Sequence, residues 1–416
     1  MKTARLIHTL TALVITCLLQ PAFAQQDMVT VTVKPPEHGS LRVDPTLPSD
    51  GRIPAGTRLQ VTATPDRGYA VDATYYEEPG VFGTMYMESM EQTLTFAPTQ
   101  DVAISALFLP EKHFDGFTVR QDIVYAQPGV KALDYDVWTP QGADNLPIVL
   151  NIHGGGWRAN TEDIMRGMAR EIVRIGRYVV ASMDYRWIST LDGDSQPNTM
   201  DDLINDVFGA IAHLQEHAEQ YGGDASRIAV TGDSAGGHLS AAAATMAHLI
   251  GDGGFGEKAG VFEFLPSYLP AGKSVDQVRS DIMQAVQAAA PSYGVFSSEM
   301  YDGGPGLTWA QEPGSDPAFA RAIAPINHIP DESERAVPHY LTRGTADPLI
   351  SDTMVTEYVK ALSAKNQRVR YDQVPYASHA FFDWKPDQVT RDTFARFGVP
   401  YIQEMTEFFD SVFYAE

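Results

Sequence analysis

Cysteine is almost absent from this sequence: Cys17 is the only one in 416 residues. The chain therefore cannot close a disulfide within itself. Loss of Cys17 with a leader peptide would also exclude a thiol nucleophile and a thiolate-bound metal. A chain of this length can instead be stable through its hydrophobic core, divided between one large domain and a smaller one.

Long hydrophobic runs are also scarce. The run near the N-terminus follows two basic residues, ends at Leu19 and precedes Ala22-Phe23-Ala24, an A-x-A cleavage pattern. We predict a secretory signal peptide over residues 1–24 with cleavage after its last alanine, and hence a secreted or periplasmic protein, or one retained at the cell surface. The run is short for an uncleaved membrane anchor. Attachment as a lipoprotein through Cys17 is a further alternative.

Positive charge is in short supply: 30 lysine and arginine residues stand against 53 aspartate and glutamate residues, for a formal net charge of −23. Removal of Lys2 and Arg5 with the signal peptide leaves 28 against 53, or −25. Such an acidic surface repels phosphate backbones and anionic membranes. We therefore expect no nucleic-acid partner and no stable membrane insertion, and attribute the charge to solubility outside the cell.

Residues 28–110 alternate apolar and polar side chains with a period of two. The runs 29–33, 59–64 and 102–106 show this alternation, and turn residues separate them. Short alternating strands between turns are typical of antiparallel sheets. We predict a small antiparallel β-domain over this range. The aromatic and methionine residues between 75 and 90 are expected to fill a core or a domain interface, with a ligand-binding surface as the alternative.

Four pieces of this region resemble the divergent bacterial surface repeat related to the B-repeat of internalins: Gly39-Ser40-Leu41, 56–65, Gly68-Tyr69 and 102–108. The resemblance covers one repeat of about eighty residues. It implies an accessory module, either a spacer or an adhesive domain, with no chemistry of its own.

From residue 114 onward, apolar strands alternate with amphipathic helices. Strands are expected at 148–152 and 178–182 around a helix over 165–175. The next helix carries four apolar residues on one face: Leu203, Val207, Ile211 and Leu214. Continuous apolar strands between such helices indicate a parallel sheet covered on both sides, and we predict an α/β domain over 114–416. Its other expected elements are strands at 285–290, 338–342 and 369–374, a closing helix at 402–412, and loop insertions at 251–272 and 297–317.

A strand-turn-helix pattern surrounds Ser234. The apolar run 228–230 predicts a buried strand, and the alanine-rich stretch 239–248 predicts a helix. Between them, Gly232, Ser234 and Gly236 form the G-x-S-x-G pattern of a nucleophile elbow, where small neighbours let the serine adopt a strained conformation. Because such a pentapeptide also occurs in ordinary turns, its meaning depends on partners elsewhere in the chain.

A glycine run, His153-Gly154-Gly155-Gly156-Trp157, directly follows the expected strand at 148–152. Glycines can turn several backbone N–H groups toward one point, where these donors stabilise the oxyanion that forms when a hydroxyl attacks a carbonyl. The run precedes the nucleophile strand, as oxyanion loops do in lipases and esterases. We prefer this interpretation to a plain glycine turn.

A serine hydroxyl becomes a good nucleophile when a histidine, oriented by a carboxylate, takes its proton. The candidate histidines after the serine are His238, His248, His328, His339 and His379. The first two belong to the nucleophile helix, His339 lies inside an apolar strand, and His328 precedes the expected acid, contrary to the order Ser, acid, His. We therefore predict His379 as base. The predicted acid is Asp347; its rival, Asp352, is expected to N-cap the following helix.

Together these motifs resemble the α/β-hydrolase esterases of the hormone-sensitive-lipase-like and BD-FAE (feruloyl and carbohydrate esterase) groups. The matching pieces are 153–158, 184–186, 232–239, 344–348 and 378–382. The resemblance implies an eight-stranded, mostly parallel sheet with flanking helices, and a reaction that needs no metal or cofactor. It also implies the residue roles: Ser234 is the nucleophile, Asp347 the acid and His379 the base, while Gly155, Gly156 and Ala235 supply oxyanion-hole N–H groups.

Nearby residues are expected to support this site. Trp157, Phe381 and Phe382 adjoin its loops and are predicted to line the substrate pocket. Asp233 is predicted to make a structural hydrogen bond in the elbow, and Asp184-Tyr185-Arg186 to form a scaffold under the oxyanion loop.

The sequence thus predicts a secreted serine carboxylesterase that hydrolyses short acyl or aryl esters, of acetyl or feruloyl type, on small molecules or polysaccharides. An amidase or arylformamidase that uses the same residues is the alternative enzyme. A surface binding protein with a vestigial hydrolase domain is the alternative without chemistry, although the complete set of Ser234, Asp347 and His379 argues against it.

Overall fold

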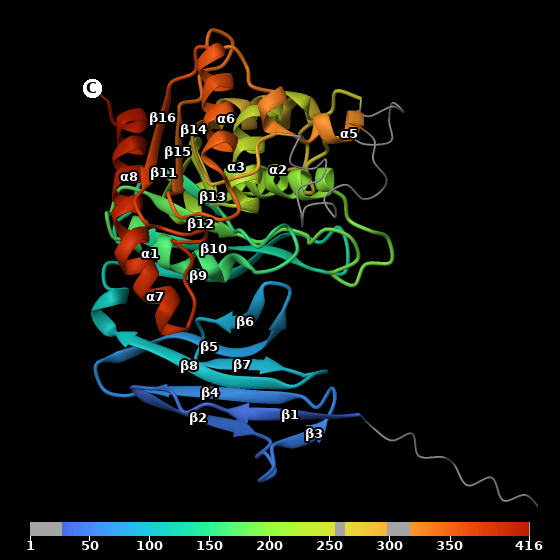
Figure 1. The fold of residues 1–416 in the computed structure, drawn as a ribbon, viewed down its shortest axis with the longest axis vertical. Coiled ribbons are helices and arrows are strands. Elements are labelled where there is room, and N and C mark those ends of the chain that lie inside the picture. The colour runs from blue at the N-terminus through green and yellow to red at the C-terminus, as the bar shows by residue number, and fades with distance from the viewer. Residues whose placement is uncertain (1–26, 254–262, 298–316, 416) are drawn as a thin grey trace, which may run out of the picture.

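The computed structural model describes residues 27–253, 263–297 and 317–415. The predicted signal peptide and much of both predicted insertions lie outside these ranges. Within them, the chain forms an N-terminal β-region and a larger α/β-region that lie against each other (Figure 1). No helix among the described residues is long and apolar enough to cross a bilayer.

An eight-stranded sheet forms the centre of the α/β-region, in the order β16-β15-β14-β13-β11-β12-β10-β9. Its strands are β9 (Phe117–Ala126), β10 (Leu133–Pro140), β11 (Leu146–Ile152), β12 (Val179–Met183), β13 (Gly223–Asp233), β14 (Val286–Ser292), β15 (His339–Gly344) and β16 (Val369–Val374). β10 pairs antiparallel with β9 and β12, and the other neighbouring strands are parallel. The predicted mostly parallel sheet is confirmed, while β9 and β10 were not anticipated.

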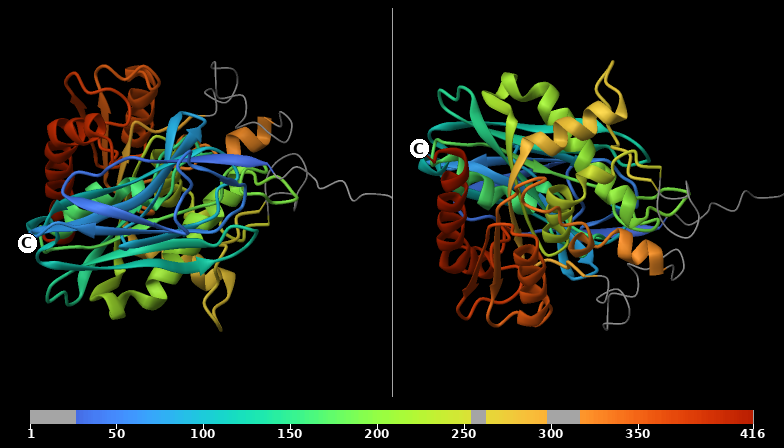
Figure 2. Two further views of the ribbon diagram at one scale, coloured as in Figure 1. Left: turned by 90° about the horizontal axis from the view of Figure 1, so that it is seen from below. Right: turned by 90° about the horizontal axis from the view of Figure 1, so that it is seen from above.

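Helices cover both faces of this sheet. α1 (Arg166–Val173) and α8 (Val399–Phe413) pack against each other on one face, while α2 (Met200–His217), α3 (Ala235–Thr245) and α4 (Val275–Ala285) form a group on the other. Figure 2 shows α8 (red) apart from the green and yellow helices α2 and α4. The middle strands β11 and β12 are buried almost throughout, as continuous apolar runs between two helical layers require.

The β-region contains two sheets, ordered β3-β1-β8-β5-β6 and β2-β4-β7. Its strands are β1 (Met28–Val33), β2 (Gly39–Asp44), β3 (Arg52–Pro54), β4 (Leu59–Pro65), β5 (Tyr69–Gly80), β6 (Gly83–Ser89), β7 (Thr93–Phe96) and β8 (Val102–Pro110). The period-two alternation turns Leu59, Val61 and Ala63 inward, where all three are fully buried. The predicted antiparallel pairing is confirmed except for β1 and β8, which run parallel.

The aromatic and methionine residues between 75 and 90 lie on the hairpin of β5 and β6. Tyr76 stacks on Phe96 inside the β-region, with ring centroids 4.2 Å apart. Met90 packs against the core of the α/β-region. The expected core and interface positions are confirmed for these two residues, whereas Phe82, at the turn, is 67% exposed.

Candidate active site

Ser234 occupies a strained turn between β13 and α3. Its φ is +51° and its ψ −110°, a conformation that costs a non-glycine residue about 1–3 kcal/mol. Glycines allow the neighbouring strand to approach: a Cβ on Gly232 would lie 2.4 Å from the carbonyl oxygen of Ile152, and a Cβ on Gly236 would lie 1.9 Å from it. The strand-turn-helix context predicted for a nucleophile elbow is therefore present.

Asp347 and His379 lie on the loops that follow β15 and β16. Nδ1 of His379 is 2.8 Å from Oδ2 of Asp347, a hydrogen bond. The other oxygen, Oδ1, accepts from the backbone N–H groups of Leu349 and Ile350 at 2.8 and 2.9 Å. Burial would raise the pKa of Asp347, but the hydrogen bond from His379 and those from the backbone outweigh it and lower the pKa. The carboxylate is therefore ionised at neutral pH and orients the histidine ring.

The rival acid, Asp352, is the first residue of α6 (Asp352–Ala364), and the predicted N-cap is wrong by one position. Ser351 is the cap, since its Oγ accepts from the backbone N–H of Met354 at 3.3 Å. Asp352 is exposed and accepts a hydrogen bond from the hydroxyl of Tyr371 at 2.8 Å. Its carboxylate therefore links the start of α6 to β16.

The end of β14 brings Ser234 and His379 to the same edge of the sheet. The backbone N–H of Ser234 donates to the carbonyl oxygen of Ser292 at 3.1 Å. The next residue, Tyr293, packs its ring edge-on against that of His379, with centroids 4.8 Å apart. Both candidate residues thus lie at the carboxyl ends of parallel strands, where ligands bind in open α/β sheets.

The glycine loop after β11 lies against the elbow. The N–H of Gly154 donates to Oδ1 of Asp233 at 2.6 Å, a structural hydrogen bond that joins the elbow to this loop. Gly155 and Gly156 have φ values of +114° and +60°, which favour glycine. Ala235 begins α3, and an N–H in the first turn of a helix has no partner within that helix.

The predicted scaffold under this loop is confirmed for Asp184 and Tyr185, whereas Arg186 pairs with Asp206 of α2. The ring of His153 stacks on that of Tyr185 at 4.1 Å, and the hydroxyl of Tyr185 donates to the carbonyl oxygen of His153 at 2.8 Å. Nε2 of His153 lies 3.1 Å from Oδ1 of Asp184. Because His153 begins the glycine run, these contacts set where that run leaves the sheet.

The structure corrects the predicted pocket walls. Trp157 is 1% exposed, and Phe381 and Phe382 are fully buried. Nε1 of Trp157 donates to Nδ1 of His238 at 3.2 Å, while Phe382 stacks on Tyr401 of α8. All three aromatic residues lie in the core behind the loops, because adjacency in sequence does not determine the side of a loop on which a side chain lies.

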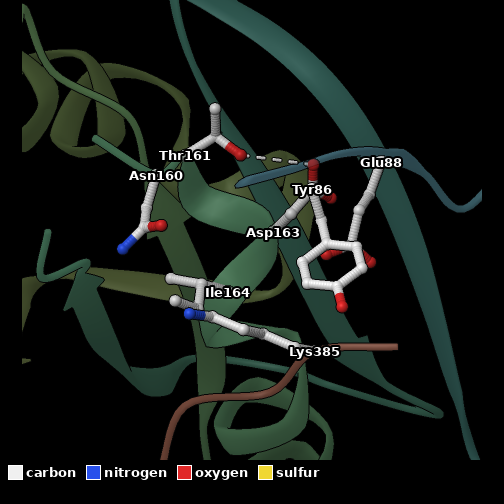
Figure 3. Close-up of a pocket in the computed structure, with 7 residues that line it drawn as sticks. All are labelled: Tyr86, Glu88, Asn160, Thr161, Asp163, Ile164 and Lys385. Carbon is white, nitrogen blue, oxygen red and sulfur yellow. Dashed lines mark hydrogen bonds between the residues drawn. The ribbon is translucent and has the colours of Figure 1, made fainter. Parts of the chain in front are cut away.

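A small polar pocket at the junction of the two regions was missed by the sequence analysis (Figure 3). It is lined by Tyr86, Glu88, Asn160, Thr161, Asp163, Ile164 and Lys385. These residues come from β6, from the segment after the glycine loop and from the segment after His379. No sequence pattern links three such distant segments.

A buried ion network also joins the two regions. Asp72 of β5 is fully buried; its Oδ1 accepts from Nη1 of Arg170 at 2.5 Å, and its Oδ2 accepts from Nε1 of Trp384 at 2.8 Å. Arg166 donates to Asp72 at 3.4 Å and to Glu88 of β6 at 2.5 Å. Since Trp384 lies on the segment that follows His379, the β-region is anchored directly to that segment.

We expect the change Asp72→Asn to lower the free energy of unfolding at pH 7 by about 3 kcal/mol, because it leaves the buried guanidinium of Arg170 without its charged partner and removes one of three carboxylates from that of Arg166. Burial alone would raise the pKa of Asp72, but Arg170 and Arg166 outweigh it and lower the pKa from 3.8 to about 2. Ionised Asp72 therefore stabilises the fold fully above about pH 4, and this contribution is lost as the pH falls toward 2.

Urea unfolding at several pH values measures this effect. The difference between wild type and Asp72→Asn should shrink between about pH 4 and pH 2, while Asp66→Asn, an exposed change in the same β-region, should match wild type throughout. Equal stability of Asp72→Asn and wild type at pH 7 would contradict the anchoring role.

Comparisons with known proteins identify the family of this chain and test its predicted fold. The BD-FAE family model matches residues 135–362, more than half of the chain, and the divergent InlB B-repeat domain matches residues 29–112. Among solved structures, esterase 2 of Thermogutta terrifontis phosphonylated by sarin is 21% identical, with a TM-score of 0.52 over 71% of this chain and 95% of that chain. The native form of that esterase has a TM-score of 0.51 at 21% identity, over 71% of this chain and 92% of that chain. The predicted α/β-hydrolase fold is confirmed.

Curated relatives include three proteins of Mycobacterium tuberculosis. The probable carboxylic ester hydrolase LipM is 28% identical over 62% of this chain and 56% of its own length. Carboxylesterase NlhH is 34% identical over 40% of this chain and 51% of its own length, and esterase LipQ is 28% identical over 66% and 60%. The chain thus spans between about half and three fifths of the length of these relatives.

Proposed function

We propose that this chain, which belongs to the BD-FAE family, is a carboxylic ester hydrolase that works through Ser234, His379 and Asp347. The observation that carries the proposal is the hydrogen-bonded pair of His379 and Asp347 at the same sheet edge as Ser234 in its strained turn. The names of its relatives, carboxylic ester hydrolase and carboxylesterase, support the same reaction.

In this mechanism, Nε2 of His379 takes the proton of Ser234 as the serine oxygen attacks the ester carbonyl. The hydrogen bond between Nδ1 and Asp347 holds the tautomer that leaves Nε2 free to accept a proton. The negative charge of Asp347 stabilises the imidazolium that then forms. We assign Gly155, Gly156 and Ala235 as backbone donors to the oxyanion. His379 then protonates the leaving alcohol, and water hydrolyses the acyl-enzyme by the same steps.

For the substrate, we propose short acyl or aryl esters of acetyl or feruloyl type, free or linked to polysaccharide. The net charge of −23 disfavours substrates that carry phosphate groups or lie in anionic membranes. We also retain, as proposals, export through the signal peptide over 1–24, an accessory B-repeat-like domain over 28–110 and a catalytic domain over 114–416. The separate hydrophobic clusters of the two regions support this division.

Paired substrates test the proposal. The purified chain is assayed with p-nitrophenyl acetate, butyrate and decanoate, with methyl ferulate, and with p-nitroacetanilide as the amide counterpart of the acetate. We expect ester turnover, with kcat/KM for the decanoate at least about tenfold below that for the better short ester. Anilide hydrolysis that equals or exceeds ester hydrolysis would instead assign an amidase. No turnover by folded protein would assign a binding protein.

A further inference from the structure

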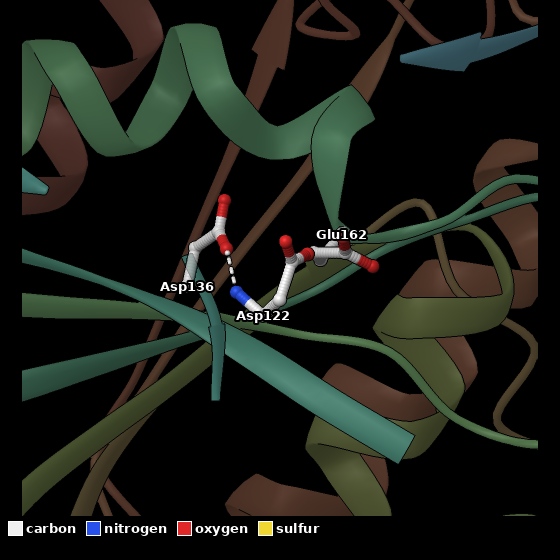
Figure 4. A group of neighbouring side chains, drawn as sticks. All are labelled: Asp122, Asp136 and Glu162. Carbon is white, nitrogen blue, oxygen red and sulfur yellow. Dashed lines mark hydrogen bonds between the residues drawn. The ribbon is translucent and has the colours of Figure 1, made fainter. Parts of the chain in front are cut away.

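Two overlapping groups of carboxylates lie where η2 (Glu162–Met165) packs against the sheet. η2 is the turn between the glycine loop and α1. The first group is Asp122, Asp136 and Glu162, and the second is Asp134, Glu162 and Asp184. In each group, one oxygen from every residue lies within 4.8 Å of the others. Figure 4 shows the first group, whose side chains come from β9, β10 and η2.

We infer that the first group binds a Ca²⁺ ion, with Glu162, Asp136 and Asp122 as ligands. This site lies outside the proposed reaction, and it would stand if the esterase proposal failed. The ion would hold η2, and through it the glycine loop, against the sheet.

The two groups differ in charge compensation. In the second, Asp184 already pairs with Lys131, whose Nζ lies 2.7 Å from Oδ2 of the carboxylate, and with His153. In the first, neither Asp122, Asp136 nor Glu162 forms an ion pair with any residue in the described ranges. Glu162 belongs to both groups, and its charge also acts on Lys131. Asp122 and Asp136 therefore lack the cation that the second group has.

Glu162 is buried without a partner. It is 8% exposed, yet its carboxylate accepts no hydrogen bond within the part of the chain that the structure describes. Acceptors in buried residues normally have a hydrogen-bond partner. The other members of its group are carboxylates, which cannot donate when ionised. Asp136 already accepts from the backbone N–H of Asp122 at 3.0 Å, and a cation would be a partner that all three carboxylates share.

A second buried oxygen without a donor lies on the same face of the sheet. Asn151 is fully buried, its Oδ1 has no hydrogen-bond partner, and its amide donates to Oγ of Ser182 at 3.5 Å. In the strand register, Ser182 stands opposite Asn151 on one side and opposite Asp136 on the other. Asn151 therefore lies in the same cross-strand row as Asp136, two strands closer to the middle of the sheet.

The local charge balance supports the same conclusion. Asp122, Asp134, Asp136, Glu162, Asp163 and Asp184 face two cationic side chains, Lys131 and Arg166. Arg166 is shared with Asp72 and Glu88 of the β-region. A bound cation would compensate part of the remaining negative charge.

The donor atoms select the ion. The group offers oxygen ligands alone, which suit hard cations rather than zinc or copper. Ca²⁺ binds oxygens at about 2.3–2.6 Å, so two of its ligands are at most about 5 Å apart, and the oxygens of this group all lie within 4.8 Å of one another. Asp122 is exposed. This exposure gives the ion access from solvent and lets water molecules complete its coordination.

Calorimetry and thermal unfolding of the purified chain, after treatment with EDTA, test the site. We expect one Ca²⁺ bound per chain and a rise in Tm of at least about 3 °C at a hundredfold excess over Kd. Glu162→Gln and Asp122→Asn should remove both the heat and the shift. In EDTA, Glu162→Gln should melt at or above the wild-type temperature, because it removes an uncompensated buried charge.

The matched control is Asp144→Asn, an exposed change in the loop between β10 and β11, which should keep the full Ca²⁺ response. A wild-type chain that shows neither heat nor shift with Ca²⁺ overturns the inference. So does a Glu162→Gln or Asp122→Asn variant that keeps the wild-type response. A third outcome is that the wild-type Tm in EDTA rises as pH falls from 8 to 6, while Ca²⁺ leaves the Tm unchanged. The carboxylates would then be neutralised by protons and not by a metal ion, and the inference would be wrong.

Discussion

Replacement of Ser234 by alanine is expected to abolish ester hydrolysis while the fold stays intact, with a loss in kcat on the order of 10⁶. The hydroxyl is the proposed nucleophile, and alanine supplies no atom that could form the acyl-enzyme. Alanine adopts the same strained backbone at φ +51° at a similar cost. The side-chain change therefore removes chemistry and leaves the contacts of Gly232 and Gly236 with β11 in place.

The control for this change is Ser226→Ala. Ser226 lies on the same strand, β13, at its exposed amino end, far from the edge that carries Ser234. Both variants are compared with wild type by p-nitrophenyl acetate hydrolysis and by thermal unfolding. Wild-type turnover in Ser226→Ala with none in Ser234→Ala is the expected result. Retained turnover in a folded Ser234→Ala variant would remove Ser234 from the mechanism.

The change Asp347→Asn is expected to lower kcat by on the order of 10⁴. Oδ1 of Asp347 already accepts two backbone N–H groups, from Leu349 and Ile350. An asparagine would keep its carbonyl oxygen at that position and turn its NH₂ group toward Nδ1 of His379. The ring would then carry its proton on Nε2, the nitrogen that must accept the proton of Ser234.

Asp352→Asn is the control for this change, because Asp352 is exposed and bonds to Tyr371 instead. It should leave kcat near the wild-type value. A bell-shaped pH profile of kcat/KM would show in addition whether the base of Asp347→Asn still titrates. A larger loss in Asp352→Asn than in Asp347→Asn would show that the acid has been assigned to the wrong carboxylate.

Local patterns were sufficient for much of the site. The apolar run that became β13, the glycines around Ser234 and the chain order of Asp347 and His379 each depend on neighbours in sequence or on a fixed order of elements. These features place residues at strand ends without any knowledge of side-chain direction. They could therefore be predicted from the sequence.

Side-chain direction and long-range contacts could not be predicted. Trp157 and Phe382 lie in the loops of the proposed site, yet their side chains are buried in the core. The backbone has positive φ at Trp157 and at Ala380, which the sequence does not reveal. β9 alternates exposed and half-buried residues at the sheet edge, so it lacks the continuous apolar run of a central strand.

Contacts between charged residues that are distant in sequence could not be predicted either. Asp72 meets Arg170 across 98 positions of sequence, and no spacing rule connects two such residues. The carboxylates of the proposed Ca²⁺ site likewise come from three elements that meet only in the folded chain. In the sequence alone, Asp72 and these carboxylates cannot be distinguished from the many other acidic residues that give the chain its net charge.

The central claim is that Ser234 is an activated nucleophile, and covalent labelling tests it most directly. The purified chain is incubated with paraoxon, an organophosphate that phosphorylates activated serines, and digested for peptide mass spectrometry. We predict one adduct per chain on the peptide that contains Ser234, formed in step with the loss of ester hydrolysis and absent from Ser234→Ala. Labelling at another residue, or hydrolysis that persists after complete labelling of Ser234, would contradict the account.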